Sequence, residues 1–112
     1  MDLAKAVEIQ LQFSKEKFPR FWNIESEVDK ALRLEYLSNA LAGEVGEFAN
    51  LVKKVVRGVV YGVGDFDLEK AKSKLAEELI DVFIYTLTIA GLLEIDIEGE
   101  FIKKLEKNRK RF

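Results

Sequence analysis

Apolar residues recur every three or four positions along most of the chain, which is the spacing of the buried face of an α-helix. This periodicity predicts four helices, over residues 3–18, 27–57, 68–93 and 97–110. The connections between them are short, and amphipathic helices joined in this way are typical of a helical bundle. The pattern therefore predicts an all-α fold, a four-helix bundle in which residues 1–112 form a single domain.

The residues between these segments are consistent with helix ends. Pro19 ends the first helix, because proline lacks the backbone N–H that a helix interior requires. Asp67 and Asp96 are predicted N-caps of the third and fourth helices, and Gly58 is the predicted terminator of the second. The stretch 58–66, which holds three glycines among Val and Tyr, is either a loop or a short strand.

Two acidic residues interrupt the hydrophobic stripes of the two longest predicted helices. Glu44 occupies a stripe position in the second helix, and Glu78 does so in the third. The other stripe positions are Leu37, Leu41, Phe48, Leu51 and Val55 in the second helix and Leu75, Val82, Thr86 and Ile89 in the third. Burying an ionised carboxylate costs several kcal/mol unless it is paired or bound to a metal. We therefore expect the two helices to face each other across a cation.

Each of these acids has a second carboxylate three residues later. Glu47 follows Glu44 and Asp81 follows Glu78, so each pair lies on one face of its helix. Four oxygen ligands without His or Cys suit Mg²⁺, with Mn²⁺ as the other candidate. Glu77 lies one position off the stripe and is expected to be solvated. The alternative is that both pairs are solvated helix faces, which are common in Glu-rich helical proteins.

The composition narrows the chemistry further. The chain has no histidine and no cysteine, which excludes His general bases, Ser-His-Asp triads, thiolate nucleophiles and Cys-based zinc sites. A formal net charge of -2 gives no sign of binding to a nucleic acid polymer. The most apolar run, 79–93, is short for a bilayer span, so no membrane partner is expected. The first residues lack the hydrophobic region of a signal peptide, and we expect a cytoplasmic protein.

Two basic clusters could bind a phosphate substrate. Lys54 lies seven residues after Glu47, on nearly the same helix face and roughly 10 Å along the axis, with Lys53 and Arg57 beside it. The second cluster occupies residues 103–111. The alternatives are that the first cluster only complements the helix dipole and that the second is a solvated chain end.

Several large apolar residues exceed what a small bundle can bury, and we expect some of them in a subunit interface. They are Phe13, Phe18, Phe21, Trp22, Val59, Tyr61 and Phe66. Trp22 is also a candidate for stacking on a nucleotide base, with packing in the core or in an interface as the alternative.

Four segments together resemble the motifs of the MazG-like nucleotide pyrophosphohydrolases, an all-α NTP pyrophosphatase group, and the resemblance covers about residues 34–111. Segment 41–48 (Leu-Ala-Gly-Glu-Val-Gly-Glu-Phe) is similar to the first metal motif, and 53–57 to the basic segment that often follows it. Segment 77–82 is similar to the second metal motif, and 95–111 to the closing helix. The chain departs from the family at Gly43, where an acid is common.

The resemblance implies a Mg²⁺-dependent enzyme that hydrolyses a nucleoside triphosphate between the α and β phosphates, giving a monophosphate and pyrophosphate, and clears non-standard or excess (d)NTPs. It implies a homodimer or homotetramer. The implied catalytic and metal-binding residues are Glu44, Glu47, Glu78 and Asp81, and the implied phosphate or nucleotide contacts are Lys54, Arg57, Lys104, Asn108 and Arg111. The alternatives are a non-catalytic bundle that binds nucleotide or a protein partner, and a purely structural oligomerisation bundle.

Overall fold

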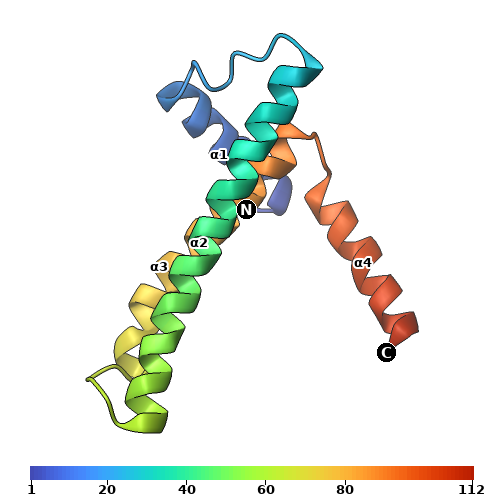
Figure 1. The fold of residues 1–112 in the computed structure, drawn as a ribbon. Helices are drawn as coiled ribbons and strands as arrows, with labels where there is room; N and C mark the ends of the chain where they lie inside the picture. The colour runs from blue at the N-terminus through green and yellow to red at the C-terminus, as the bar shows by residue number, and fades with distance from the viewer. The chain divides into compact units, whose positions relative to one another are not determined.

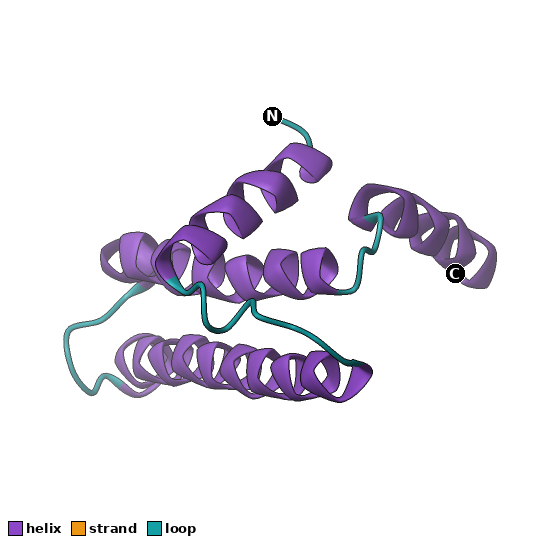
Figure 2. Ribbon diagram, turned by 90° about the horizontal axis from the view of Figure 1, so that it is seen from above, coloured by secondary structure: helices purple, strands orange, loops and turns teal.

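The structure, a computed structural model, describes all of residues 1–112. Its regular secondary structure consists only of helices, which are joined by loops (Figures 1 and 2). The four helices are α1 (Leu3–Lys17), α2 (Glu27–Tyr61), α3 (Leu68–Leu92) and α4 (Ile97–Arg111). The predicted all-α fold is thus confirmed, and the predicted helix ends agree to within one residue except at the end of α2. None of the four helices combines the length and apolarity that crossing a membrane would need.

The helix starts follow from short polar side chains that accept the first free backbone N–H groups. The Oδ1 atoms of Asp67 and Asp96 accept from the N–H groups three residues later, at 2.8 and 3.1 Å, as predicted for N-caps. At the start of α2, Ser26 Oγ accepts from Asp29 N at 3.0 Å, and the Asp29 carboxylate accepts from Glu25 N at 3.1 Å. These side chains fix where α2, α3 and α4 begin.

The prediction that Gly58 ends the second helix was wrong, because α2 continues to Tyr61. The chain leaves the helix at Gly62, whose φ of 67° lies in the left-handed region that glycine tolerates best. The N–H of Val63 then donates to the carbonyl oxygen of Arg57 at 2.9 Å. The rest of the stretch is a loop and not a strand.

Gly58 has a different role, which is close packing. A Cβ atom at this position would overlap the backbone carbonyl of Phe66, so only glycine allows the returning loop to lie against α2. The glycine thus sets the path of the connection from α2 to α3.

The chain divides into two compact units, and each is described by itself. The first comprises residues 1–37 and 86–112, and the second comprises residues 38–85. The expectation of a single MazG-like domain stays a prediction. The second unit holds the acidic motifs, and the first holds Trp22 and the C-terminal basic cluster.

In the first unit, α1 packs against α4, and the connection between α1 and α2 is held by side-chain contacts. Trp22 Nε1 donates to the buried Ser14 Oγ at 2.8 Å, and Arg33 Nε donates to the carbonyl oxygen of Phe21 at 2.5 Å. The rings of Phe21 and Trp22 meet edge to face, with centroids 5.3 Å apart. The loop after Pro19 is therefore tied to both helices that it joins.

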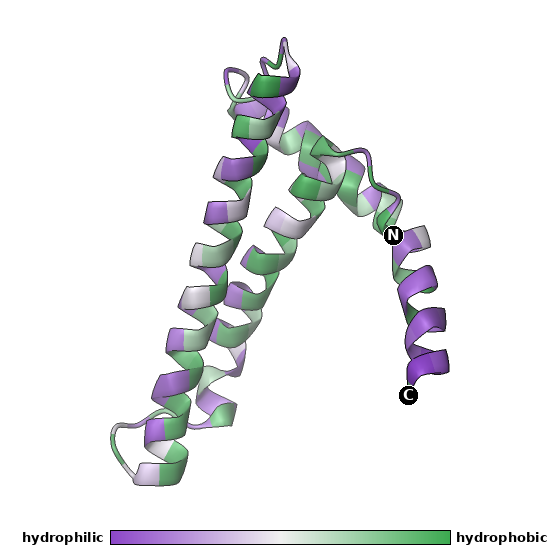
Figure 3. Cartoon of the chain, turned by 45° about the vertical axis from the view of Figure 1, so that its right-hand side comes forward, coloured by the Kyte–Doolittle hydropathy of each residue, from purple (hydrophilic) through white to green (hydrophobic).

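The apolar residues of α4 are only partly buried. Leu105 is half-buried, but Phe101 and Ile102 are 59% and 50% exposed. Figure 3 shows α4 as a mostly hydrophilic helix, so it has little apolar surface to bury.

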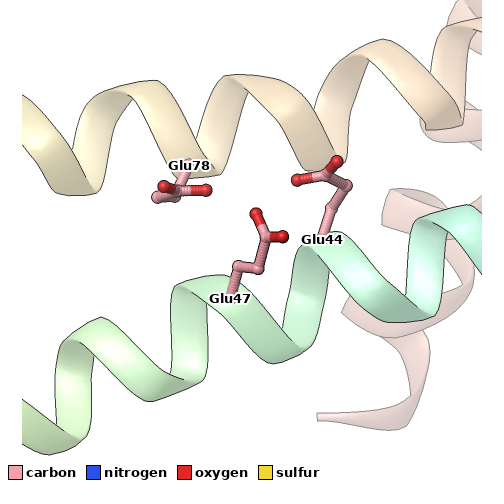
Figure 4. Close-up of side chains that lie close together, drawn as sticks. All are labelled: Glu44, Glu47 and Glu78. Atoms are coloured by element: carbon pink, nitrogen blue, oxygen red, sulfur yellow. The ribbon is translucent and has the colours of Figure 1, made fainter.

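The second unit is a helical hairpin in which residues 38–61 of α2 and 68–85 of α3 lie side by side (Figures 1 and 4). Leu51, Val55 and Ala71 are buried in it. The remaining stripe residues of the hairpin are half-buried, which confirms the predicted stripes, and they are Leu41, Glu44, Phe48, Leu75, Glu78 and Val82. The hairpin therefore turns both interrupting acids inward.

Candidate metal centre and active site

Three carboxylates from the two helices of the hairpin lie close together (Figure 4). Glu44 and Glu47 come from α2, and Glu78 comes from α3. Each offers one oxygen to a group in which all the oxygens lie within 4.8 Å of one another. The convergence follows from the sequence, because the i,i+3 spacing puts both α2 acids on the face that α3 covers.

Burial distinguishes two of these three acids from an ordinary acidic surface, whereas Glu47 is exposed. Glu44 and Glu78 are half-buried, and the side chain of Glu78 is only 14% exposed. The Oε2 atoms of both residues are enclosed and accept no hydrogen bond. A buried carboxylate oxygen without a partner is rare, because it loses its hydration and gains nothing in return.

The electrostatics of the group are unfavourable as they stand. The pKa of Glu44 is raised, first because the carboxyl group is desolvated and then because Glu47, Asp81 and Glu78 repel its charged form. A hydrogen bond between the Glu44 and Glu47 carboxyl groups acts in the same direction. Each of these effects favours a neutral Glu44 in the absence of a cation, and a bound cation would reverse the balance.

These residues fit a hard divalent cation. All the donors are carboxylate oxygens, which Mg²⁺ and Mn²⁺ prefer. Opposite ligands on an octahedral Mg²⁺ are about 4.2 Å apart, close to the 4.8 Å within which these oxygens lie. A bound ion would give a positive partner to the two carboxylates whose Oε2 atoms are enclosed and have no hydrogen bond.

The fourth predicted ligand, Asp81, is not one of the three mutually close carboxylates. It is half-buried one turn beyond Glu78 on α3, and it is near enough to Glu44 to raise the pKa of that residue. Its place among the ligands stays a prediction. Glu77 is also outside the group, and its side chain is 71% exposed, as expected for a solvated residue.

Lys74, which is not among the predicted site residues, contacts the group. Lys74 Nζ lies 3.8 Å from Glu78 Oε1 and 3.6 Å from Glu77 Oε2. The signal was present in the sequence, because Lys74 precedes Glu78 by four residues and such pairs are neighbours on a helix.

Lys54 and Arg57 lie on α2 within the same unit as the acids. Both side chains are exposed, and neither forms an ion pair. They remain available to an anionic ligand, and their assignment as phosphate contacts stays a prediction.

The remaining predicted substrate contacts belong to the first unit. Lys104, Asn108 and Arg111 lie on α4, where Lys104 and Arg111 are exposed and Asn108 is half-buried. The indole N–H of Trp22 is used by Ser14, and Lys15 Nζ lies 5.5 Å from its ring centroid. These contacts favour the alternative that Trp22 is a packing residue.

The MazG nucleotide pyrophosphohydrolase domain family matches residues 33–112, which include all four acids. The chain belongs to this family. Trp22 lies outside the matched range, whereas Lys54, Lys74 and the basic residues of α4 lie inside it.

Among characterised proteins, the chain is similar to human dCTP pyrophosphatase 1, with 37% identity over 73 residues. The aligned part is 65% of this chain and 42% of the human protein, so the chain spans less than half the length of that relative. No solved structure matches the chain.

Proposed function

We propose that the protein is a Mg²⁺-dependent nucleoside triphosphate pyrophosphohydrolase, which cleaves a (d)NTP between the α and β phosphates to a monophosphate and pyrophosphate. Membership of the MazG nucleotide pyrophosphohydrolase family supports this reaction class. The structural observation that carries the proposal is the pair of enclosed, unpartnered Oε2 atoms of Glu44 and Glu78 within a group of three carboxylates. A solvated acidic face would not bury such atoms.

In the proposed site, Glu44, Glu47, Glu78 and Asp81 hold the metal. When bound, Mg²⁺ neutralises charge on the polyphosphate and makes a water molecule more nucleophilic. The carboxylates orient the attacking water in line with the α-phosphorus, and one of these acids or a neighbouring Glu accepts its proton. Glu44 and Glu78 are half-buried, which restricts the access of competing water molecules to that side of the group, whereas Glu47 is exposed.

The exposed Lys54 and Arg57 bind the phosphate tail in this proposal, because they are free cations on the helix that carries Glu44 and Glu47. Lys104, Asn108 and Arg111 are assigned to the nucleotide on the family resemblance. Trp22 is the weakest of these assignments, since its N–H group already has an internal partner.

We further propose that the protein acts as a homodimer or homotetramer on non-standard or excess (d)NTPs of the cytoplasmic pool. Five of the seven apolar residues expected in an interface are largely exposed, at 40–72%, and they are Phe13, Phe18, Val59, Tyr61 and Phe66. Burial of such side chains between subunits would remove apolar surface from water. The name of the human relative makes dCTP the first substrate to test.

The deciding experiment is pyrophosphate release from a panel of (d)NTPs that includes dCTP, with Mg²⁺ present and absent. Glu44→Gln and Asp81→Asn should each lower kcat by about a thousandfold, since a metal that stabilises charge is worth several kcal/mol. Glu69→Gln, an exposed acid in the first turn of α3, is the matched control and should leave kcat unchanged. Circular dichroism verifies that the variants stay helical.

The same assay tests the non-catalytic alternative. A bundle that only binds nucleotide would show saturable binding without pyrophosphate release at any metal concentration. If Glu44→Gln and Asp81→Asn released pyrophosphate as fast as the wild-type protein, these acids would have no part in the mechanism.

A further inference from the structure

Lys74 occupies a place that the proposed reaction does not explain. It lies on α3, one turn before the acids Glu77 and Glu78, and its ammonium group is shared between the two. The distance is 3.6 Å to Glu77 Oε2 and 3.8 Å to Glu78 Oε1. The two acceptors differ sharply, because the Glu77 side chain is 71% exposed and the Glu78 side chain is 14% exposed.

The two oxygens of Glu78 therefore have different surroundings. Oε1 faces the ammonium group of Lys74, whereas Oε2 is enclosed and has no hydrogen-bond partner. Lys74 makes the only ion pair to any of the three clustered carboxylates. Lys74 thus supplies one positive charge, which does not balance the negative charge of three carboxylates.

We propose that Lys74 is a built-in counter-ion that competes with the divalent metal for Glu78, and that Glu77 receives Lys74 when the metal binds. The inference rests on the proposed metal centre. Lys74 offsets part of the repulsion among the acids while the centre is empty, and its charge opposes a dication that approaches the same carboxylate.

The sharing between Glu77 and Glu78 makes the exchange inexpensive. Lys74 is 60% exposed and already within 3.6 Å of Glu77, so it can leave Glu78 by a small side-chain rotation without losing its ion pair. The Glu78 carboxylate can then present both oxygens to the metal. Lys74 is in this account a positioning residue, which acts through Glu78.

The test is a titration of the full chain with Mn²⁺ in the absence of nucleotide. Binding is measured as the loss of the free-ion signal in electron paramagnetic resonance. Lys74→Gln should lower the Kd for Mn²⁺ by about two- to fivefold, the range that corresponds to exposed ion pairs. Lys74→Arg, which keeps the charge, should bind Mn²⁺ as the wild type does.

Lys72→Gln is the matched control. Lys72 lies two residues earlier on α3, so its side chain leaves the helix on a nearly opposite side, and it forms no ion pair. Equal tightening in Lys72→Gln and Lys74→Gln would reduce the effect to overall charge and overturn the inference.

A double-mutant cycle with Glu77→Gln tests the exchange itself. Alone, Glu77→Gln should weaken Mn²⁺ binding, because Lys74 is then left with Glu78 as its one partner. In the Lys74→Gln background, most of this weakening should disappear. The same weakening in both backgrounds would show that Glu77 acts only through its charge, which would contradict its role as receiver.

The outcomes separate this inference from the proposed function. A wild-type protein that bound no Mn²⁺ would refute the metal centre and, with it, the role of Lys74. A wild-type protein that bound Mn²⁺ with the same Kd as Lys74→Gln would leave the metal centre standing and refute only the counter-ion.

Discussion

The buried polar groups of the two units differ in whether they have hydrogen-bond partners. In the first unit, the buried hydroxyl of Ser14 accepts a hydrogen bond from Trp22 Nε1 at 2.8 Å. In the second unit, the enclosed Oε2 atoms of Glu44 and Glu78 have no partner. The first arrangement stabilises a loop, and the second costs free energy in the absence of a ligand.

This difference separates structural from functional residues without reference to any relative. A protein keeps an unsatisfied buried carboxylate only where something else binds it, and here two such groups, Glu44 and Glu78, lie in one cluster with the exposed Glu47. Mutation of the buried Ser14 in the first unit should therefore act through stability alone. Mutation of Glu44 or Glu78 in the second unit should act through metal binding and activity.

The largest expected effect is the stabilisation of the second unit by metal. Mg²⁺ or Mn²⁺ at a hundred times its Kd should raise the free energy of unfolding by about 2.7 kcal/mol, because it binds only the folded state. Glu44→Gln should abolish most of this gain, whereas Ser14→Ala should keep it in full. Thermal unfolding with the metal and with a chelator measures both, and a full metal response in Glu44→Gln would contradict the contrast between the units.

The second prediction concerns two glycines of α2 within the hairpin. Gly58→Ala should lower the free energy of unfolding by about 2 kcal/mol, because the new methyl group would overlap the backbone of Phe66. Gly46→Ala should raise it by roughly 0.5–1 kcal/mol, since no atom lies within 4 Å of the added Cβ and alanine favours a helix. Urea unfolding measures both. Equal effects of the two changes would disprove the close packing at Gly58.

In the first unit, Ser14→Ala should cost about 1–2 kcal/mol, because it leaves the indole N–H of Trp22 without its partner. Ser73→Ala, at an exposed position of α3, should change stability by less than about 0.5 kcal/mol. The chain has one tryptophan, so its fluorescence also reports on the site. An unchanged emission spectrum and an unchanged unfolding midpoint in Ser14→Ala would refute the anchoring role.

The smallest expected effect is a pH dependence of the metal-free protein. The pKa of Glu44 is raised in the folded state above its ordinary value of 4.5, so the folded state binds its proton more tightly than the unfolded state. This contribution to stability is present at low pH and is lost as the pH rises from 4.5 through the raised pKa. Glu44→Gln removes the charge, so its advantage over the wild type in chelator should grow with pH. A difference between the two that does not vary with pH would contradict the assigned cause.

The sequence by itself determined the helices, the buried stripes and the two acids that interrupt them. These are local properties, because helical periodicity and the side chains of Asp67 and Asp96 act within a few residues. The i,i+3 spacing likewise places Glu44 and Glu47 on one face of the helix, independently of any tertiary contact.

Only the tertiary structure decided that Gly58 serves close packing inside α2 and does not end the helix, because the contact that requires a glycine there is made by the distant Phe66 backbone. It also decided which carboxylate oxygens are buried without partners. Side-chain placement depends on what the facing helix excludes from water, and no single stretch of sequence contains that information.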